Sequence, residues 1–178
     1  MPPRARFAIG AGAILLFAGF FVAAVEHHRR DAARRAFSAE GRRLSALWAA
    51  RLADRWGQKP VRDLLMRRLF AEPDSRAAGL GDENGRLVVL HGAVAGDPPP
   101  GSADVPRDRP LSGGAWGFWA PVIVAGERVG TLFWARDAAP LAAADRRARR
   151  AGIAAFAWAA GVLLWTVFPL FRPPPRPS

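Results

Sequence analysis

Two long runs of apolar residues lie near the two ends of the chain, and the residues between them mix polar and apolar side chains. The first run, 7–25, reads FAIGAGAILLFAGFFVAAV, and the second, 151–171, reads AGIAAFAWAAGVLLWTVFPLF. At a rise of about 1.5 Å per residue, each run can cross a hydrocarbon core of about 30 Å. A domain of this size has no interior deep enough to bury two helices that are apolar on every side. The pattern therefore predicts two transmembrane helices.

The segments outside the two runs are short. Residues 1–6 form an N-terminal tail, and residues 172–178 read RPPPRPS, which is rich in proline and too short to fold. A cleavable signal peptide is an alternative for the first run, because Val22 and Ala24 resemble a cleavage site after a basic start. The run is long for a signal peptide, which favours an uncleaved anchor.

The central segment, 26–150, begins with helical patterns. Apolar residues recur every three, four or seven positions from Glu26 to Gln58, which predicts a long helix that continues from the first run. They are Ala33, Phe37, Leu44, Leu47, Leu52 and Trp56. Gly57 then ends this helix, and Pro60 is well placed to begin a second helix that runs through Phe70.

Strand patterns follow the two helices. Residues 77–92 predict a hairpin that turns at Asn84 and Gly85, a pair that tolerates positive φ. Residues 92–114 are rich in Gly, Pro, Asp and Ser and predict an irregular loop. Residues 115–124 and 128–136 predict a second strand pair, in which Pro121 is typical of an edge or bulged strand.

A further helix from Ala138 leads into the second apolar run. The predicted fold class is therefore α+β, with a small antiparallel sheet packed on the long helix and placed between two transmembrane helices. This arrangement buries one apolar face of the sheet and one of the helix.

Charge and composition change the picture little. A formal net charge of +11 is typical of nucleic-acid-binding proteins, but the arginines are spread along the predicted helices and lie beside both apolar runs. Lipid headgroups attract cations at such positions. We therefore expect contact with the lipid bilayer and no nucleic-acid binding. The absence of cysteine excludes disulfides and thiolate metal sites.

Two turn-and-strand motifs carry a resemblance to a known family. Residues 81–88 read GDENGRLV, and residues 120–122 (APV) are followed by GERVGTL at 126–132. Both resemble the hairpins of extracytoplasmic PAS-like (single Cache-like) sensor domains, which lie between two membrane helices in bacterial histidine kinases, diguanylate cyclases and chemoreceptors. The resemblance covers about residues 26–171. It implies a sensor in the bacterial inner membrane, although no kinase or cyclase domain follows Phe171.

The side of the membrane that the central domain faces is a conflict between two indicators. Four arginines follow the first run and two precede it, which favours a cytoplasmic domain. Loops longer than about 60 residues escape this charge rule, and the resemblance implies a periplasmic domain. We expect the domain to be periplasmic.

The candidate binding residues are aromatic. Trp116, Phe118 and Trp119 lie on one predicted strand, and Phe133 and Trp134 lie on its expected neighbour. Alternation sends Trp116 and Phe118 to one face and Trp119 to the other, and it also separates Phe133 from Trp134. The cluster is either core or the wall of a ligand pocket. In the pocket interpretation the ligand-binding residues are Trp116, Phe118 and Trp134, with Arg128 or His91 as the polar anchor.

Catalytic and metal sites are not indicated. His27 and His28 are adjacent on a helix, where their side chains point about 100° apart and do not converge on one ion. Gly79, Gly81 and Gly85 precede a strand rather than the helix that a dinucleotide fingerprint requires. We expect a non-enzymatic protein without a cofactor.

The expected function is a membrane-anchored sensor or ligand-binding module that signals through its transmembrane helices to a separate membrane or signalling protein. The ligand is expected to be a small molecule, and pairing of two copies is left open. The alternative is a structural or scaffold subunit of an envelope complex. A cavity lined by aromatic and polar groups would favour sensing, whereas a packed interior with an exposed apolar patch would favour assembly.

Overall fold

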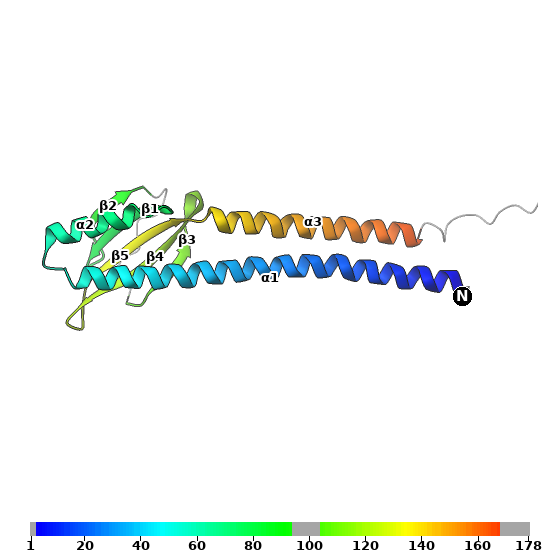
Figure 1. Ribbon diagram of the computed structural model, residues 1–178, viewed down its shortest axis with the longest axis horizontal. Helices are drawn as coiled ribbons and strands as arrows, with labels where there is room; N and C mark the ends of the chain where they lie inside the picture. Colours follow the sequence, from blue (N-terminus) through cyan, green and yellow to red (C-terminus); the bar gives the residue numbers. More distant parts are fainter. Residues whose placement is uncertain (1–2, 94–103, 168–178) are drawn as a thin grey trace, which may run out of the picture. The chain divides into compact units, whose positions relative to one another are not determined.

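The computed structural model describes residues 3–93 and 104–167, which form three α-helices and one five-stranded antiparallel sheet (Figure 1). The helices are α1 (Pro3–Ala53), α2 (Lys59–Phe70) and α3 (Ala139–Val167). The strands are β1 (Ser75–Asp82), β2 (Leu87–Gly92), β3 (Arg107–Pro110), β4 (Ala115–Val124) and β5 (Glu127–Asp137), in the spatial order β2-β1-β5-β4-β3. The α+β class is confirmed.

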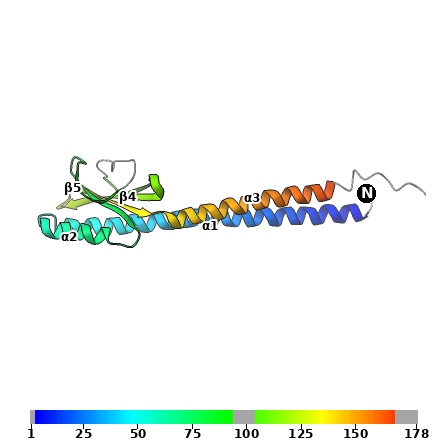
Figure 2. The same ribbon diagram turned by 90° about the horizontal axis from the view of Figure 1, so that it is seen from above.

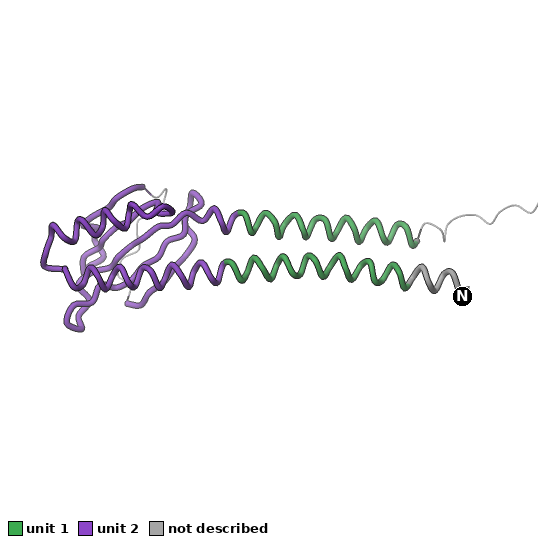
Figure 3. The backbone as a smooth tube through the Cα atoms, viewed as in Figure 1, with its two compact units in different colours: residues 1–33, 143–178 green, residues 34–142 purple. Residues whose placement is uncertain are grey.

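The chain divides into two compact units (Figure 3). Residues 34–142 form the sheet domain. Residues up to 33 and from 143 onward form the helical unit, in which the first part of α1 is grouped with most of α3. The last residues of the second apolar run, 168–171, and the expected tail at 172–178 lie outside the described residues.

The helices of the sheet domain follow the sequence pattern closely. The expected long helix ends at Ala53 rather than Gln58, because the chain turns over residues 54–57. Pro60 lies in the first turn of α2, as predicted. Gly41 does not interrupt α1, and a Cβ atom there would lie 2.1 Å from the Phe118 ring. The glycine therefore lets α1 approach the sheet.

Both predicted hairpins are present. In the first, the Asp82 carboxylate accepts hydrogen bonds from the backbone N–H groups of Asn84 and Arg86, which stabilises the turn. In the second, Ala125 and Gly126 both have positive φ, at 50° and 86°, as a two-residue hairpin turn requires. The register of β4 against β5 shifts after Val122, next to Pro121.

The prediction of an irregular loop over 92–114 is wrong for its last part. Residues 107–110 form β3, which pairs with Trp116–Trp119 of β4, and Ser112–Gly114 form a short 3-10 helix. The sequence RDRP has neither apolar alternation nor β-branched residues, so pairing with β4 rather than local preference makes it a strand. Residues 94–103 of the expected loop lie outside the described residues.

The main core lies between the sheet and the two helices α1 and α2, which cover the same side of the sheet (Figure 2). We call this side the inner face. Its buried residues are Ala49, Leu52, Met66, Leu69, Ala78, Leu80, Ala120, Val122, Leu132 and Trp134. A smaller cluster on the opposite, outer face contains Ala77, Trp119, Phe133 and Ala135. The predicted division of the aromatic residues between the two faces is confirmed.

In the helical unit, α1 contacts α3 along a narrow seam. The less exposed positions of α1 alternate at spacings of four and three residues: Gly12, Leu16, Gly19, Ala23, Glu26 and Arg30. On α3, Ala148, Ala155 and Val162 are buried at every seventh position. Such spacing is typical of two helices that pack side by side.

One helical segment among the described residues, Gly10–Ala53, contains a stretch long and apolar enough to cross a membrane. The mean hydropathy of that stretch is 1.7, and only 6% of it is buried. An N-terminal signal sequence has the same properties. Membrane crossing by the second apolar run stays a prediction.

Candidate functional site

Three of the five predicted binding residues meet on the inner face of the sheet. The Phe118 and Trp134 rings lie 6.2 Å apart, and Phe37 of α1 contacts both Phe118 and Trp116. Phe118 is fully buried and Trp134 is 2% exposed. These rings therefore pack as part of the core, and no cavity in the described part of the chain is lined by them.

The other two predicted binding residues lie apart from this cluster. His91 stacks on Phe70 of α2, with the ring centroids 6.1 Å apart. Arg128, near the start of β5, donates a hydrogen bond to the backbone carbonyl of Glu83 and lies 3.6 Å from the Asp104 carboxylate. Neither residue is a polar anchor for the aromatic cluster, and a ligand-binding role for the five residues stays a prediction.

Arg136 is the polar anchor that the aromatic cluster does have. Its guanidinium carbon lies 4.9 Å from the centre of the Phe37 ring and 5.0 Å from that of Trp134, so the cation is placed between two aromatic faces. The guanidinium also donates to the Asp74 carboxylate and lies 3.9 Å from Glu40. Arg136 is only 9% exposed, so it connects α1, the start of β1 and the end of β5.

The connection from β5 to α3 is short and held on both sides. One residue, Ala138, separates the strand from the helix. The backbone N–H of Asp137 donates to the carbonyl of Asp74, and its carboxylate accepts from the backbone N–H of Ala139 and from Arg76. These two donors stabilise the charged carboxylate, the Ala139 amide more than Arg76, and they lower the pKa of Asp137 below its ordinary value of 3.8.

The outer face carries a small cavity with mixed aromatic and polar walls. It has a volume of about 110 Å³ and is lined by Arg107, Asp108, Arg109 and Trp119. Trp119 is 1% exposed, and within the described residues its indole N–H has no hydrogen-bond partner. Because an unpaired buried donor is unfavourable, an acceptor group placed in this cavity would be stabilised.

Electrostatics at this cavity favour an anion. Arg107 is paired with Trp119 in the sheet register, so both side chains project from the outer face. The Arg109 guanidinium lies 5.5 Å from the centre of the Trp119 ring. The volume is below the range of about 300–1,000 Å³ typical of drug-sized ligands, which restricts the cavity to a small group.

Beta strand β5 lies between this cavity and the cluster at Arg136. Phe133 contacts Trp119 on the outer face, with the ring centroids 5.2 Å apart. The next residue, Trp134, packs on the inner face and donates its indole N–H to the Ser75 hydroxyl. A change in the position of β5 caused at the cavity would therefore reach Arg136 three residues later.

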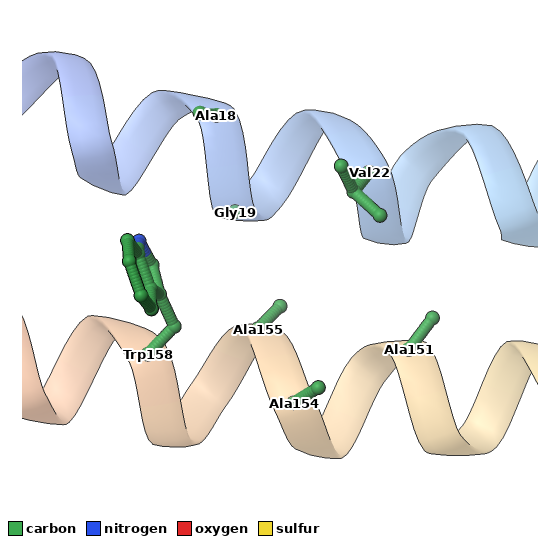
Figure 4. Close-up of a pocket in the computed structure, with 7 residues that line it drawn as sticks. All are labelled: Ala18, Gly19, Val22, Ala151, Ala154, Ala155 and Trp158. Carbon is green, nitrogen blue, oxygen red and sulfur yellow. The ribbon is translucent and has the colours of Figure 1, made fainter.

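The helical unit has larger but apolar hollows on either side of Trp158. One, of about 340 Å³, is lined by Ala18, Gly19, Val22, Ala151, Ala154, Ala155 and Trp158 (Figure 4), and the other has a volume of about 560 Å³. Figure 4 shows the Trp158 ring opposite Gly19, where a Cβ atom would lie 2.9 Å from the ring. The indole N–H donates to the Leu15 carbonyl at 2.9 Å.

Among residues 3–93 and 104–167, no three His, Asp or Glu side chains come close enough to hold a metal ion. His27 accepts or donates a hydrogen bond with Arg30, and His91 stacks on Phe70.

Sequence reasoning missed Arg107 and Arg109, which fall in the segment expected to be irregular, and it missed Arg136. Alternation of Arg with other residues in RDRP was the one available signal for β3. The pairing of Arg136 with Asp74 joins residues far apart in the chain, and no local pattern indicates it.

A scan against models of protein families and searches of curated proteins and of solved structures find no match to this chain.

Proposed function

We propose that the protein is a membrane-anchored, non-enzymatic sensor or ligand-binding module that passes its state through two transmembrane helices to a separate protein. One observation carries this proposal. Helix α1 contains both the exposed apolar stretch and residues of the inner core, such as Leu52, while β5 leads through the single residue Ala138 into α3. Both chain connections of the sheet domain are therefore short and regular.

A PAS-like architecture is part of the proposal. Its support is a small antiparallel sheet with a long helix on its inner face, in which both resembling segments form hairpins at the expected turns. The domain would face the periplasm of a bacterial inner membrane. A small anionic ligand at the Trp119 cavity would be the input.

Two membrane spans are also part of the proposal, and the helical unit supports them. Gly12 faces Val162 and Thr166, Gly19 faces Trp158, and Arg30 lies 3.8 Å from Asp145. Between the last two contacts, Val25, the last residue of the first apolar run, lies about level with Ala151, the first of the second. Two apolar runs that begin at one level suit a common bilayer boundary.

The coupling can be tested by disulfide cross-linking, because the natural chain contains no cysteine. In isolated membranes, the pair Gly12→Cys and Val162→Cys should form a disulfide across the seam, where a Cβ at position 12 lies 3.6 Å from Val162. Adding Arg136→Gln should change the rate of cross-linking several-fold if the cluster controls the helices. Adding Arg55→Gln, an exposed residue of the same domain, is the matched control.

Equal rates in the Arg136→Gln and Arg55→Gln backgrounds would argue against coupling, provided that both proteins melt cooperatively. The partner can be sought with a photoreactive amino acid at Leu164, which is 70% exposed. A protein adduct is expected there, and adducts with lipid alone, at Leu164 and at Trp165, would count against a signalling partner.

A scaffold role is the second candidate, and one observation favours it. Leu87, Val88 and Leu90 of the edge strand β2 are 42%, 56% and 46% exposed, which makes an apolar patch on an open sheet edge. If Val88→Asp abolishes partner capture while the cross-linking response to Arg136→Gln is kept, assembly through β2 accounts for the partner better than signalling through the helices.

A further inference from the structure

The first turns of α3 carry four arginines in five residues, directly before its apolar run. They are Arg146, Arg147, Arg149 and Arg150, which we call the α3 arginine patch. All four are exposed. Within the described part of the chain none of them has a hydrogen-bond or ion-pair partner.

The carboxylates at this level are engaged elsewhere. Glu26 pairs with Arg29 at 2.8 Å, and Asp31 pairs with Arg30 at 2.9 Å. Asp145, the nearest acidic residue of α3, lies 3.8 Å from Arg30. The α3 arginine patch therefore keeps its full positive charge.

Helix geometry places the patch on one side of α3. With about 100° between successive residues, the four arginines cover an arc of about 160°. Ala148, the residue among them that is buried against α1, lies on the opposite side. The patch therefore faces away from the seam and is accessible to a large partner.

Apolar side chains continue this same side toward the second run. Ile153 is 71% exposed and Phe156 is 77% exposed, and by the same geometry both lie on the arginine side of α3. A surface that changes from four unpaired cations to exposed apolar side chains within two turns matches an anionic phospholipid, with its phosphate on the arginines and its acyl chains along Ile153 and Phe156.

We propose that the α3 arginine patch binds the headgroups of anionic phospholipids, in preference to zwitterionic ones, in the leaflet on the side of the sheet domain. This inference rests on the proposed function, because it requires the second apolar run to lie in a bilayer. Arginine is well suited to this role, since its planar guanidinium matches phosphate oxygens in a bidentate geometry.

The test uses the full-length protein in detergent, titrated with phosphatidylglycerol or phosphatidylcholine of identical acyl chains, with bound lipid counted by native mass spectrometry. We expect phosphatidylglycerol to bind at least about tenfold more tightly, since each arginine near an anionic headgroup contributes measurably. In the variant with Arg146, Arg147, Arg149 and Arg150 all changed to Gln, this preference should fall to within about twofold of phosphatidylcholine.

A matched control removes the same charge from another place. Arg55, Arg67, Arg68 and Arg86 are exposed residues of the sheet domain, and changing all four to Gln should leave the preference unchanged. Equal loss in both variants, or no preference in the natural protein, would overturn the proposal. Helix content and melting of each variant are measured by circular dichroism, and a fold lost on changing all four is replaced by the pair Arg146→Gln and Arg150→Gln.

Two further arms separate other causes. Soluble glycerol phosphate that displaces the lipid at similar concentrations would mean a site for free phosphate, and an acidic protein that copurifies through the patch in place of lipid would mean a protein interface; either overturns the proposal. Failure of the natural protein to insert into vesicles would instead contradict the membrane function itself.

Discussion

Single residues hold the end of the sheet domain from which α3 begins. Asp137 accepts from the first backbone N–H of α3 and from Arg76, and Arg136 is placed between Phe37 and Trp134. Each contact joins an element of the sheet to a helix. These side chains therefore set the position of the residue at which β5 ends.

Asp137 should make stability depend on pH in acid. Because the folded protein lowers the pKa of Asp137 below 3.8, its charged form stabilises the fold above that pH, and this contribution is lost as the pH falls through the lower folded pKa. Asp137→Asn keeps an acceptor for the Ala139 N–H but has no charge. We expect the melting temperature of the variant to fall less steeply below about pH 4 than that of the natural protein.

The measurement is thermal melting by circular dichroism from pH 6 to pH 2.5. Arg76→Gln removes the second donor to the same carboxylate and should flatten the same part of the curve. Identical acid profiles for all three proteins would show that Asp137 does not contribute.

At the scale of elements, the packing of α1 against α3 depends on a hydrogen bond in apolar surroundings. The Trp158 indole N–H reaches the Leu15 carbonyl because Gly19, one turn further along α1, has no side chain in the way. In lipid, where water cannot replace it, such a bond contributes about 0.6 kcal/mol on average.

Trp158→Phe should therefore weaken the helix pair while keeping an aromatic ring. We expect slower disulfide formation between Gly12→Cys and Val162→Cys in membranes, and Gly19→Leu should have a larger effect because its side chain would meet the Trp158 ring. Trp165→Phe, at a 61% exposed position of the same helix, is the control. A rate that Trp158→Phe and Trp165→Phe alter equally would contradict this role for the bond.

The sequence was informative wherever structure depends on neighbouring residues. Asn84 with Gly85 and Ala125 with Gly126 carry their own turn chemistry, so both hairpins were predicted, and strand alternation placed Phe118 and Trp119 on opposite faces. It failed at β3, which exists through pairing with β4, and at Arg136, whose partner Asp74 is 62 residues away. The Trp119 cavity depends on β3 and could not be predicted without it.

At the scale of the whole molecule, two spans would place both ends of the chain on one side of the membrane and the sheet domain on the other. Single cysteines at Arg55 and at Ser178 can report this, because the natural chain has none. With a membrane-impermeant maleimide and an opened outer membrane, we expect Arg55→Cys to be labelled and Ser178→Cys to be labelled only after the inner membrane is lysed.

Labelling of both positions before lysis would mean that α3 does not cross the bilayer. Protection of Arg55→Cys with labelling of Ser178→Cys would reverse the orientation and would favour the charge rule over the family resemblance.

The notch at Gly19 also limits how the chain can evolve. Any larger residue at position 19 would collide with the indole at 158, and a smaller residue at 158 would leave the notch empty, so neither position is free to drift alone. Among descendants of this sequence the two should covary, a bulkier 19 accompanying a slighter 158, even where the sheet domain has diverged beyond recognition.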